Sequence, residues 1–409
     1  MDMRFLMRQA QQMQAKLQEA QQNLRAEGTA GGELVKVVLN GSKELMDLSI
    51  AKDAIDPEDP SMLEDLLKAG GSDLHLTTGN PPMARIQSRL VPLKGPVFAP
   101  GEIGAFLYSI MTEEQAEAFE KKKELDFAYA LTLEKRFRVN VHRQRGQTEA
   151  AIRVVPSQVG NWKELTLPPI VEQWARKPDG LILIAGPTGS GKTTTLNTLV
   201  RMINDQREGV VICLERPIEY VHTNKKSIIK QREIGNDTIS YAEAVRQAMR
   251  QDPDVIVVGE IEDQETVLTV LNAAQAGNLV FASVHGSNTE GAIDRLINLC
   301  SADQRQQVTF QLSTCLHGIM TQHLFPREHG QMSGTGAGLV LATEVFVMTE
   351  AAQNHIRTNN LVQLRSVIET GVGLKMHTLE SSIKQLSDKG MISPAISSRY
   401  LYSGKRPGG

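Results

Sequence analysis

The sequence predicts an α/β fold whose largest part is a parallel sheet covered by helices. Three observations support this. Apolar, strand-like segments alternate with helix-like segments from Leu181 onward. The first apolar segment, residues 181–185, is followed by a glycine-rich run and then by a helix-forming stretch, residues 194–203. Two later apolar segments, residues 210–214 and 255–258, are followed by acidic residues. Parallel strands would bring these ends to one edge of the sheet.

The glycine-rich run, residues 186–193, reads Gly-Pro-Thr-Gly-Ser-Gly-Lys-Thr. In this strand–loop–helix setting it predicts a phosphate-binding loop, because glycines allow backbone N–H groups to turn toward a phosphate. A glycine-rich turn without function is the alternative, and the complete pattern argues against it. The sequence therefore predicts a bound nucleoside triphosphate, with Lys192 on the β and γ phosphates and the Thr193 hydroxyl on Mg²⁺. The residues expected to bind are Gly186, Pro187, Thr188, Gly189, Ser190, Gly191, Lys192, Thr193 and Thr194.

Three further polar residues follow predicted strands. Glu219 comes after residues 210–214, Glu260 after residues 255–258, and His285 after residues 279–284. A carboxylate beside a phosphate loop can hold the hydration shell of Mg²⁺ or polarise the attacking water. Alone, each could be a solvated strand end or a structural histidine. Their order after a phosphate loop favours a hydrolytic site.

Composition argues against several other classes of protein. The chain of 409 residues is long enough for two or three domains, and its net charge of −3 gives no general argument for nucleic acid or an anionic membrane. Its three widely spaced cysteines argue against a disulfide framework and against a four-cysteine zinc site. We find no apolar run near the roughly 20 residues that span a bilayer and no signal peptide, so we expect a cytoplasmic protein.

The region before residue 181 predicts smaller elements. An apolar stripe predicts a helix over residues 3–26, and Asn40-Gly41 predicts a turn that joins strands 33–39 and 44–50 in a hairpin. A Pro- and Asp-rich stretch then opens a short helix at Ser61. Residues 72–155 show a mixed α/β pattern, and residues 156–169 read as a linker.

Residues 68–395 resemble the type II/IV secretion and type IV pilus ATPases. Within that family they are most similar to the ATPases that retract pili in twitching motility. The motifs that carry the resemblance are residues 72–76 with 81–82, 138–146, 186–193, 217–222, 252–256 with 259–260, His285 with 293–297, and 355–364 with 376–379. The zinc insertion of assembly-type relatives is missing. The resemblance implies a RecA-like nucleotide-binding domain over 161–395, a PAS-like α/β domain over 68–160, an extension over 1–67 and a tail over 396–409.

The resemblance also implies roles for the candidate residues. Glu219 would be the general base that orients water, Glu260 would stand on the Mg²⁺ side, and His285 would sense the γ-phosphate. Arg138, Arg143 and Arg145 would act as arginine fingers from the PAS-like domain, although a solvated strand face is the simpler interpretation of these three residues.

The partners implied by the resemblance are those of a pilus motor. They are further copies of the chain in a homo-hexamer, an inner-membrane platform protein and a paralogous motor ATPase. ATP hydrolysis with Mg²⁺ would drive retraction, and the protein would act at the cytoplasmic face of the inner membrane.

The first 67 residues are similar to the YbaB nucleoid-associated proteins. The similarity lies in residues 3–20, 31–41 and 55–66. It implies DNA binding, although the mixed local charge fits a dimerising or partner-docking element at least as well. A nucleic-acid-associated or regulatory NTPase therefore remains the alternative function.

Two positions depart from the usual family motifs. Arg216 stands where the family usually has aspartate, and Glu262 where it usually has arginine. If the two face each other across neighbouring strand ends, the sequence has exchanged the partners of an ion pair. Two unrelated substitutions or a weakened active site are the alternatives.

Overall fold

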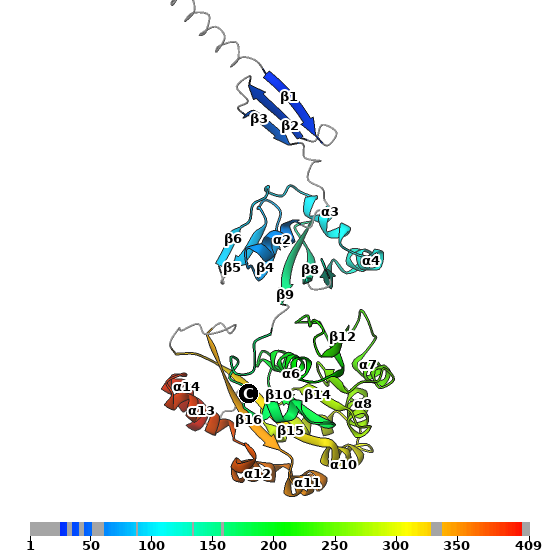
Figure 1. The fold of residues 1–409 in the computed structure, drawn as a ribbon, viewed down its shortest axis with the longest axis vertical. Helices are drawn as coiled ribbons and strands as arrows, with labels where there is room; N and C mark the ends of the chain where they lie inside the picture. The colour runs from blue at the N-terminus through cyan, green and yellow to red at the C-terminus, as the bar shows by residue number, and fades with distance from the viewer. Residues whose placement is uncertain are drawn as a thin grey trace, which may run out of the picture. The chain divides into compact units, whose positions relative to one another are not determined.

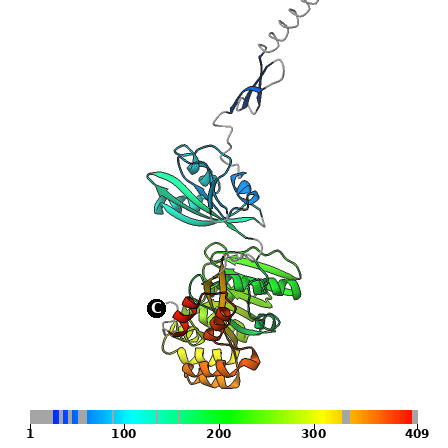
Figure 2. The same ribbon diagram turned by 90° about the vertical axis from the view of Figure 1, so that its left-hand side faces the viewer.

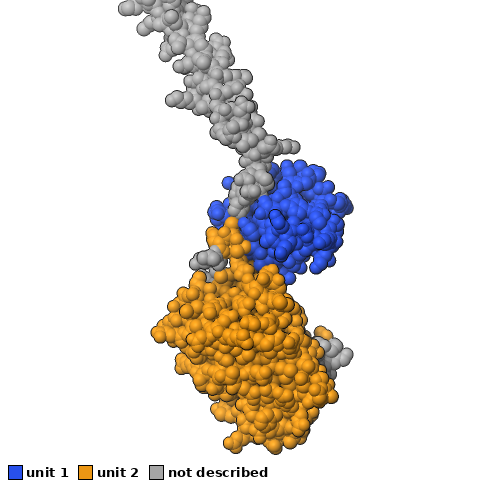
Figure 3. Space-filling model, turned by 90° about the vertical axis from the view of Figure 1, so that its right-hand side faces the viewer, with its two compact units in different colours: residues 1–129, 137–154 blue, residues 130–136, 155–409 orange. Residues whose placement is uncertain are grey.

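The computed structural model describes residues 25–30, 35–40, 45–50, 61–86, 89–132, 135–156, 159–328 and 338–402. The chain divides into two compact units (Figure 3). Unit 1 comprises Met1–Tyr129 and Phe137–Val154, and unit 2 comprises Ala130–Arg136 and Val155–Gly409.

The first described strands form a three-stranded antiparallel sheet, β1 (Arg25–Ala30), β2 (Val35–Asn40) and β3 (Leu45–Ile50), in the order β1-β2-β3 (Figure 1). The predicted hairpin is confirmed as β2 and β3. The predicted helix over residues 3–26 is wrong at its end, because Arg25 and Ala26 belong to β1 and pair with β2. The rest of that helix lies outside the described residues.

Unit 1 is built on a six-stranded sheet in the order β6-β5-β4-β9-β8-β7. Its strands are β4 (Asp73–Leu76), β5 (Met83–Ile86), β6 (Arg89–Pro92), β7 (Glu124–Ala130), β8 (Arg136–Gln144) and β9 (Gln147–Val155). Its helices are α2 (Ser61–Lys68), α3 (Glu102–Ser109) and α4 (Glu113–Lys122). The short helix predicted at Ser61 is α2, whose Leu63 and Leu66 are fully buried.

Unit 2 contains a seven-stranded sheet in the order β12-β11-β13-β14-β10-β15-β16. The strands are β10 (Gly180–Ala185), β11 (Gly209–Glu215), β12 (Ser227–Glu233), β13 (Val255–Val258), β14 (Leu279–Val284), β15 (Leu316–Pro326) and β16 (Leu339–Val347). Every neighbouring pair is parallel except β15 and β16, which are antiparallel. The predicted parallel sheet is therefore confirmed.

Helices cover both faces of this sheet because its central strands are apolar on both sides. Ile182 and Ile184 of β10 pack with α5 (Ile170–Ala175) and α6 (Lys192–Gln206). Leu181 and Leu183 point to the opposite core, which includes residues of α7 (Tyr241–Ala248), α8 (Gln264–Gln275), α9 (Thr289–Asn298), α10 (Arg305–Cys315), α11 (Glu350–Arg357) and α12 (Leu364–Thr370).

The last helices pack on the β15–β16 pair. These helices, α13 (Leu379–Asp388) and α14 (Pro394–Tyr402), are coloured red in Figure 2. Ile383 of α13 lies in a small apolar core with Phe325 of β15, and the Tyr400 ring of α14 stands edge-on to Phe325. The first part of the predicted tail, up to Tyr402, is thus helical. Among the helices that the structure describes, none is long and apolar enough to span a membrane.

Candidate nucleotide-binding and hydrolysis site

The phosphate loop joins β10 to α6, as the sequence predicts. Gly186, Gly189 and Gly191 have φ angles of 151°, 77° and 88°, a region that favours glycine. A Cβ on Gly186 would lie only 2.4 Å from the Ser190 hydroxyl oxygen and 2.7 Å from the carbonyl oxygen of Gln322. The loop therefore needs glycine both for its backbone conformation and for its close packing against β15.

Lys192 lies inside this loop. Its Nζ donates hydrogen bonds to the carbonyl oxygens of Gly186 at 2.9 Å and Pro187 at 3.0 Å. Burial lowers the pKa of the Lys192 ammonium, and the negative charge of Glu260 opposes that shift. The ammonium group is therefore held where a phosphate would meet it.

A cavity of about 480 Å³ opens over the loop at the carboxyl edge of the sheet. Glu219, Glu260 and His285 line this cavity together with Lys192 and Thr193, so the structure brings the predicted hydrolytic residues to one place. The predicted binding residues Gly186, Pro187 and Ser190 do not line this cavity. The Ser190 hydroxyl is buried and has no hydrogen-bond partner among the residues that the structure describes. The other lining residues include Thr188, Gly189, Gly191, Thr194, Asn197, Glu215, Arg216 and Tyr241.

Glu260 and His285 are direct partners, with 2.6 Å between Glu260 Oε1 and His285 Nε2. Neighbouring parallel strands bring them together, because β13 precedes Glu260 and β14 precedes His285. The Glu260 side chain is 28% exposed and that of His285 45% exposed, so both groups can reach a ligand in the cavity.

Glu219 follows β11 on the segment of residues 216–222 and is exposed. Arg216 of this segment pairs with Glu262, which follows β13. Since β11 and β13 are neighbours, the structure confirms that the two departures from the family motifs face each other across adjacent strand ends.

The three arginines proposed as fingers lie in unit 1. Arg143 pairs with Glu120 at 2.8 Å, and its guanidinium lies 5.2 Å from the ring centre of Phe119. Arg138 Nε lies 3.9 Å from Asp126 Oδ1. Arg145 is exposed in the turn after β8, with φ of 50°. Their role toward a nucleotide remains a proposal.

Four polar residues near the site were not predicted as functional: Asn197, Glu215, His222 and Gln231. Gln231 Nε2 donates to Glu215 Oε1 at 2.9 Å, and His222 Nε2 lies 2.6 Å from Asn197 Oδ1. The signal available in the sequence was weak, since a glutamine in β12 or an asparagine in α6 reads as an ordinary surface residue. Their burial depends on contacts distant in sequence.

Burial shifts the pKa of two of these groups in directions that favour the neutral form of each. It raises the pKa of the Glu215 carboxyl from 4.5 to about 7, although hydrogen bonds from Gln231 and Asn197 oppose the shift. It lowers the pKa of the His222 imidazole from 6.5 to about 4. Near neutral pH the His222 ring is therefore uncharged.

Comparison with known proteins places this site in a family. A model of the type II/IV secretion system proteins matches residues 52–389, and a model of the YbaB/EbfC DNA-binding family matches residues 1–74. The "Type IV pilus retractation ATPase PilT" of Pseudomonas aeruginosa is 37% identical over 326 residues, which cover 80% of this chain and 93% of that protein. A twitching motility protein of Neisseria gonorrhoeae is 35% identical over 318 residues, which cover 78% of this chain and 83% of that protein.

The fold agrees with these similarities. The crystal structure of the pilus retraction motor PilT with bound ADP superposes with a TM-score of 0.74 at 38% identity, covering 84% of this chain and 96% of that one. The predicted fold class, the nucleotide-binding function, ATP hydrolysis and both resemblances noted in the sequence are confirmed. The chain belongs to the type II/IV secretion system protein family and is similar over most of its length to the PilT ATPases.

Proposed function

We propose that this chain is a motor that hydrolyses ATP to retract type IV pili, the function stated in the names of its relatives. The observation that carries the proposal is one cavity that joins Lys192 of the phosphate loop to Glu219, Glu260 and His285. Hydrolysis requires a phosphate cradle, an oriented water and groups that respond to the γ-phosphate. A residue that lines this cavity is the candidate for each of these requirements.

Glu219 is the proposed general base. Its exposed carboxylate accepts a proton from the attacking water, whose oxygen forms the new bond to the γ-phosphorus as the bond to the β–γ bridging oxygen breaks, and this proton then passes to the released phosphate. The released ADP and inorganic phosphate carry the negative charge that Lys192 stabilises. His285, held by Glu260 at 2.6 Å, is proposed to contact the γ-phosphate.

Mg²⁺ fits the oxygen donors of this site. The hydroxyl of Thr193 in the first turn of α6 and the carboxylate of Glu260 line the same cavity. Mg²⁺ is typically bound through one or two protein oxygens, phosphates and waters, so no larger protein cluster is needed. When bound, the ion would neutralise charge on the β and γ phosphates.

We further propose that the motor works as a homo-hexamer. Arg138, Arg143 and Arg145 lie in unit 1 and the phosphate loop lies in unit 2, and we propose that these arginines act as arginine fingers on the nucleotide. An inner-membrane platform protein and a paralogous motor ATPase are the proposed partners, at the cytoplasmic face of the inner membrane. Light scattering with and without nucleotide tests the assembly, and a strictly monomeric active enzyme would contradict it.

A Glu219→Gln variant tests the hydrolytic assignment. It should bind ADP normally and lose at least about 100-fold in hydrolysis, because the amide accepts a proton poorly. In cells, the same substitution should abolish twitching and raise the number of pili. Normal hydrolysis by the variant would contradict the role of Glu219, and normal twitching by an inactive variant would contradict retraction.

The YbaB match over residues 1–74 favours one second function, a nucleic-acid-associated NTPase. Binding of the purified chain to duplex DNA at increasing salt, with and without residues 1–60, tests it. Binding that weakens steeply with salt and needs residues 1–60 would support this function, because phosphate contacts release counterions. Equal binding by both chains would count against it.

A further inference from the structure

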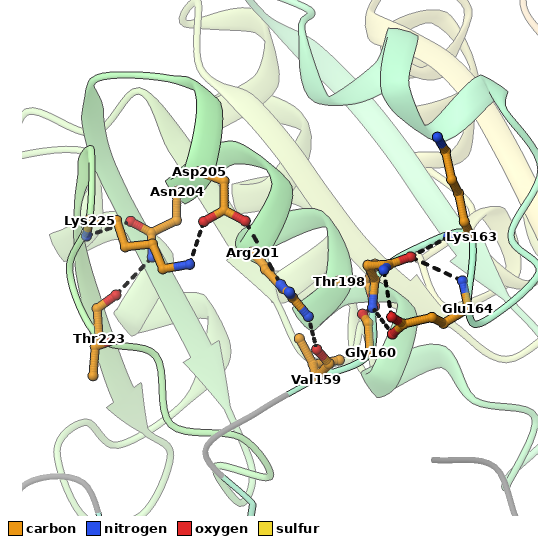
Figure 4. Close-up of polar contacts among 11 residues, drawn as sticks. Val159, Gly160, Lys163, Glu164, Thr198, Arg201, Asn204, Asp205, Thr223 and Lys225 are labelled. Atoms are coloured by element: carbon orange, nitrogen blue, oxygen red, sulfur yellow. Dashed lines mark hydrogen bonds and ion pairs between the residues drawn. The ribbon is translucent and has the colours of Figure 1, made fainter. Parts of the chain in front are cut away.

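The phosphate-loop helix α6 carries polar side chains that hold two separate backbone segments (Figure 4). Toward the linker, Arg201 donates to the carbonyl oxygen of Val159, and Thr198 lies 3.4 Å from the carbonyl oxygen of Gly160. On the other side, Asn204 Nδ2 donates to the carbonyl oxygen of Thr223 at 2.8 Å. The segment that follows Glu219 is therefore hydrogen-bonded to the helix that follows the phosphate loop.

A further contact of this kind involves His222, three residues after Glu219. Asn197 Nδ2 donates to the carbonyl oxygen of Thr193 at 3.0 Å, while Asn197 Oδ1 lies 2.6 Å from His222 Nε2. A carbonyl oxygen only accepts, so the amide nitrogen of Asn197 must face Thr193 and its oxygen must face His222. The neutral His222 ring consequently carries its proton on Nε2 and donates a hydrogen bond to Asn197 Oδ1.

Gln231 of β12 binds the backbone of the same segment. Its Nε2 donates to the carbonyl oxygen of Tyr220 at 2.7 Å, and its Oε1 accepts from the backbone N–H of His222 at 2.9 Å. The Tyr220 hydroxyl lies 3.3 Å from Thr194 Oγ1 of α6. The residues directly after Glu219 are thus held between β12 and α6.

We propose that His222 and Gln231 are positioning residues that fix Glu219 relative to the phosphate loop. His222 acts through Asn197, whose other hydrogen bond ends at Thr193, and Gln231 acts through the backbone of Tyr220 and His222. The inference rests on the proposed role of Glu219 as the general base. A base must be held within a fraction of an ångström of its productive place, and a displacement of 1 Å can cost about 100-fold in rate.

The test compares His222→Phe with His222→Gln. Phenylalanine keeps the ring but loses the donor to Asn197, whereas the glutamine amide nitrogen can replace it. His222→Phe should lower kcat at least about tenfold, with the Kd for ADP and the KM for ATP changed less than about twofold. His222→Gln should recover most of kcat. Gln231→Met, which has similar length without the hydrogen bonds, should repeat the fall in kcat and serves as the second variant if His222→Phe does not fold.

A double variant separates positioning from a general loss of structure. In a Glu219→Gln background, His222→Phe should produce little further loss of the residual rate, because there is no base left to misplace. Equal kcat in His222→Phe and His222→Gln, or a weakened ADP affinity in His222→Phe, would overturn the proposal. Full activity of Glu219→Gln would instead contradict the general base itself, whatever the His222 variants do.

Discussion

Arg216 donates to both carboxylate oxygens of Glu262, and this pair connects the segment after β11 to the segment after β13. The Arg216 guanidinium also lies 5.6 Å from the ring centre of Tyr241. The two side chains are 50% and 36% exposed, and Arg216 lines the cavity. The ion pair of Arg216 and Glu262, in which the charges of the usual family residues are exchanged, therefore joins the ends of β11 and β13 close to Glu260.

A double-mutant cycle measures this link. Because the pair is substantially exposed, Arg216→Asp or Glu262→Arg alone should lower the free energy of unfolding by about 1 kcal/mol or less. Each single change places like charges side by side and should also lower hydrolysis. The double change restores opposite charges, and the coupling energy should exceed about 0.5 kcal/mol. Additive effects of the two single changes would show that the contact has no energetic role.

Lys192→Ala should abolish ATP hydrolysis and leave the fold intact. The substitution removes the charge that stabilises the phosphates, while the Lys192 side chain contributes no apolar core volume. The measurements are phosphate release and circular dichroism. Lys226→Ala, which changes an exposed lysine in the loop before β12, is the matched control and should hydrolyse normally. Near-normal hydrolysis by Lys192→Ala would contradict the location of the site.

The contrast between the predicted and unpredicted parts of the site has a physical basis. The phosphate loop is a local pattern, in which positive φ angles, the helix start and the lysine lie within eight residues, so its structure could be predicted. Glu219, Glu260 and His285 could be predicted because parallel strands bring their ends to one edge.

The parts that were missed depend on long-range pairing. β1 has the sequence Arg-Ala-Glu-Gly-Thr-Ala, which lacks an alternating apolar pattern, and it pairs along its whole length with β2. Gln231 reads as a solvent-facing strand residue until its contacts with Glu215, Tyr220 and His222 are known. Such contacts join residues of neighbouring strands and a loop, and the spacing of these residues in the sequence does not predict them.

Glu215→Gln should change how stability depends on pH. Burial raises the Glu215 pKa from 4.5 to about 7, so between these values the folded protein keeps a proton that the unfolded chain releases. The free energy of unfolding of the wild type therefore falls as pH rises through this window, by about 3 kcal/mol from this group. Glutamine cannot ionise, and it keeps an oxygen to accept from Gln231.

Urea unfolding at pH 5 and pH 8 checks this prediction. The stability of Glu215→Gln relative to the wild type should increase between the two pH values. Glu208→Gln, a change of an exposed carboxyl between α6 and β11, is the control and should show no such increase. A constant difference between Glu215→Gln and the wild type would mean that Glu215 is not held neutral in the folded protein.

Two N-terminal truncations should have different effects because α2 belongs to the core of unit 1. Removing residues 1–60 leaves α2 in place, whereas removing residues 1–67 deletes Leu63 and Leu66, both fully buried. Burial of each leucine contributes about 1.5–3 kcal/mol, so the longer deletion should lower the melting temperature and expose unit 1 to proteolysis. The shorter deletion should keep near-normal ATP hydrolysis, because the cavity residues lie between Thr188 and Leu324. If the shorter chain stays folded and assembled but loses hydrolysis, the extension is coupled to the active site and the two parts do not act independently.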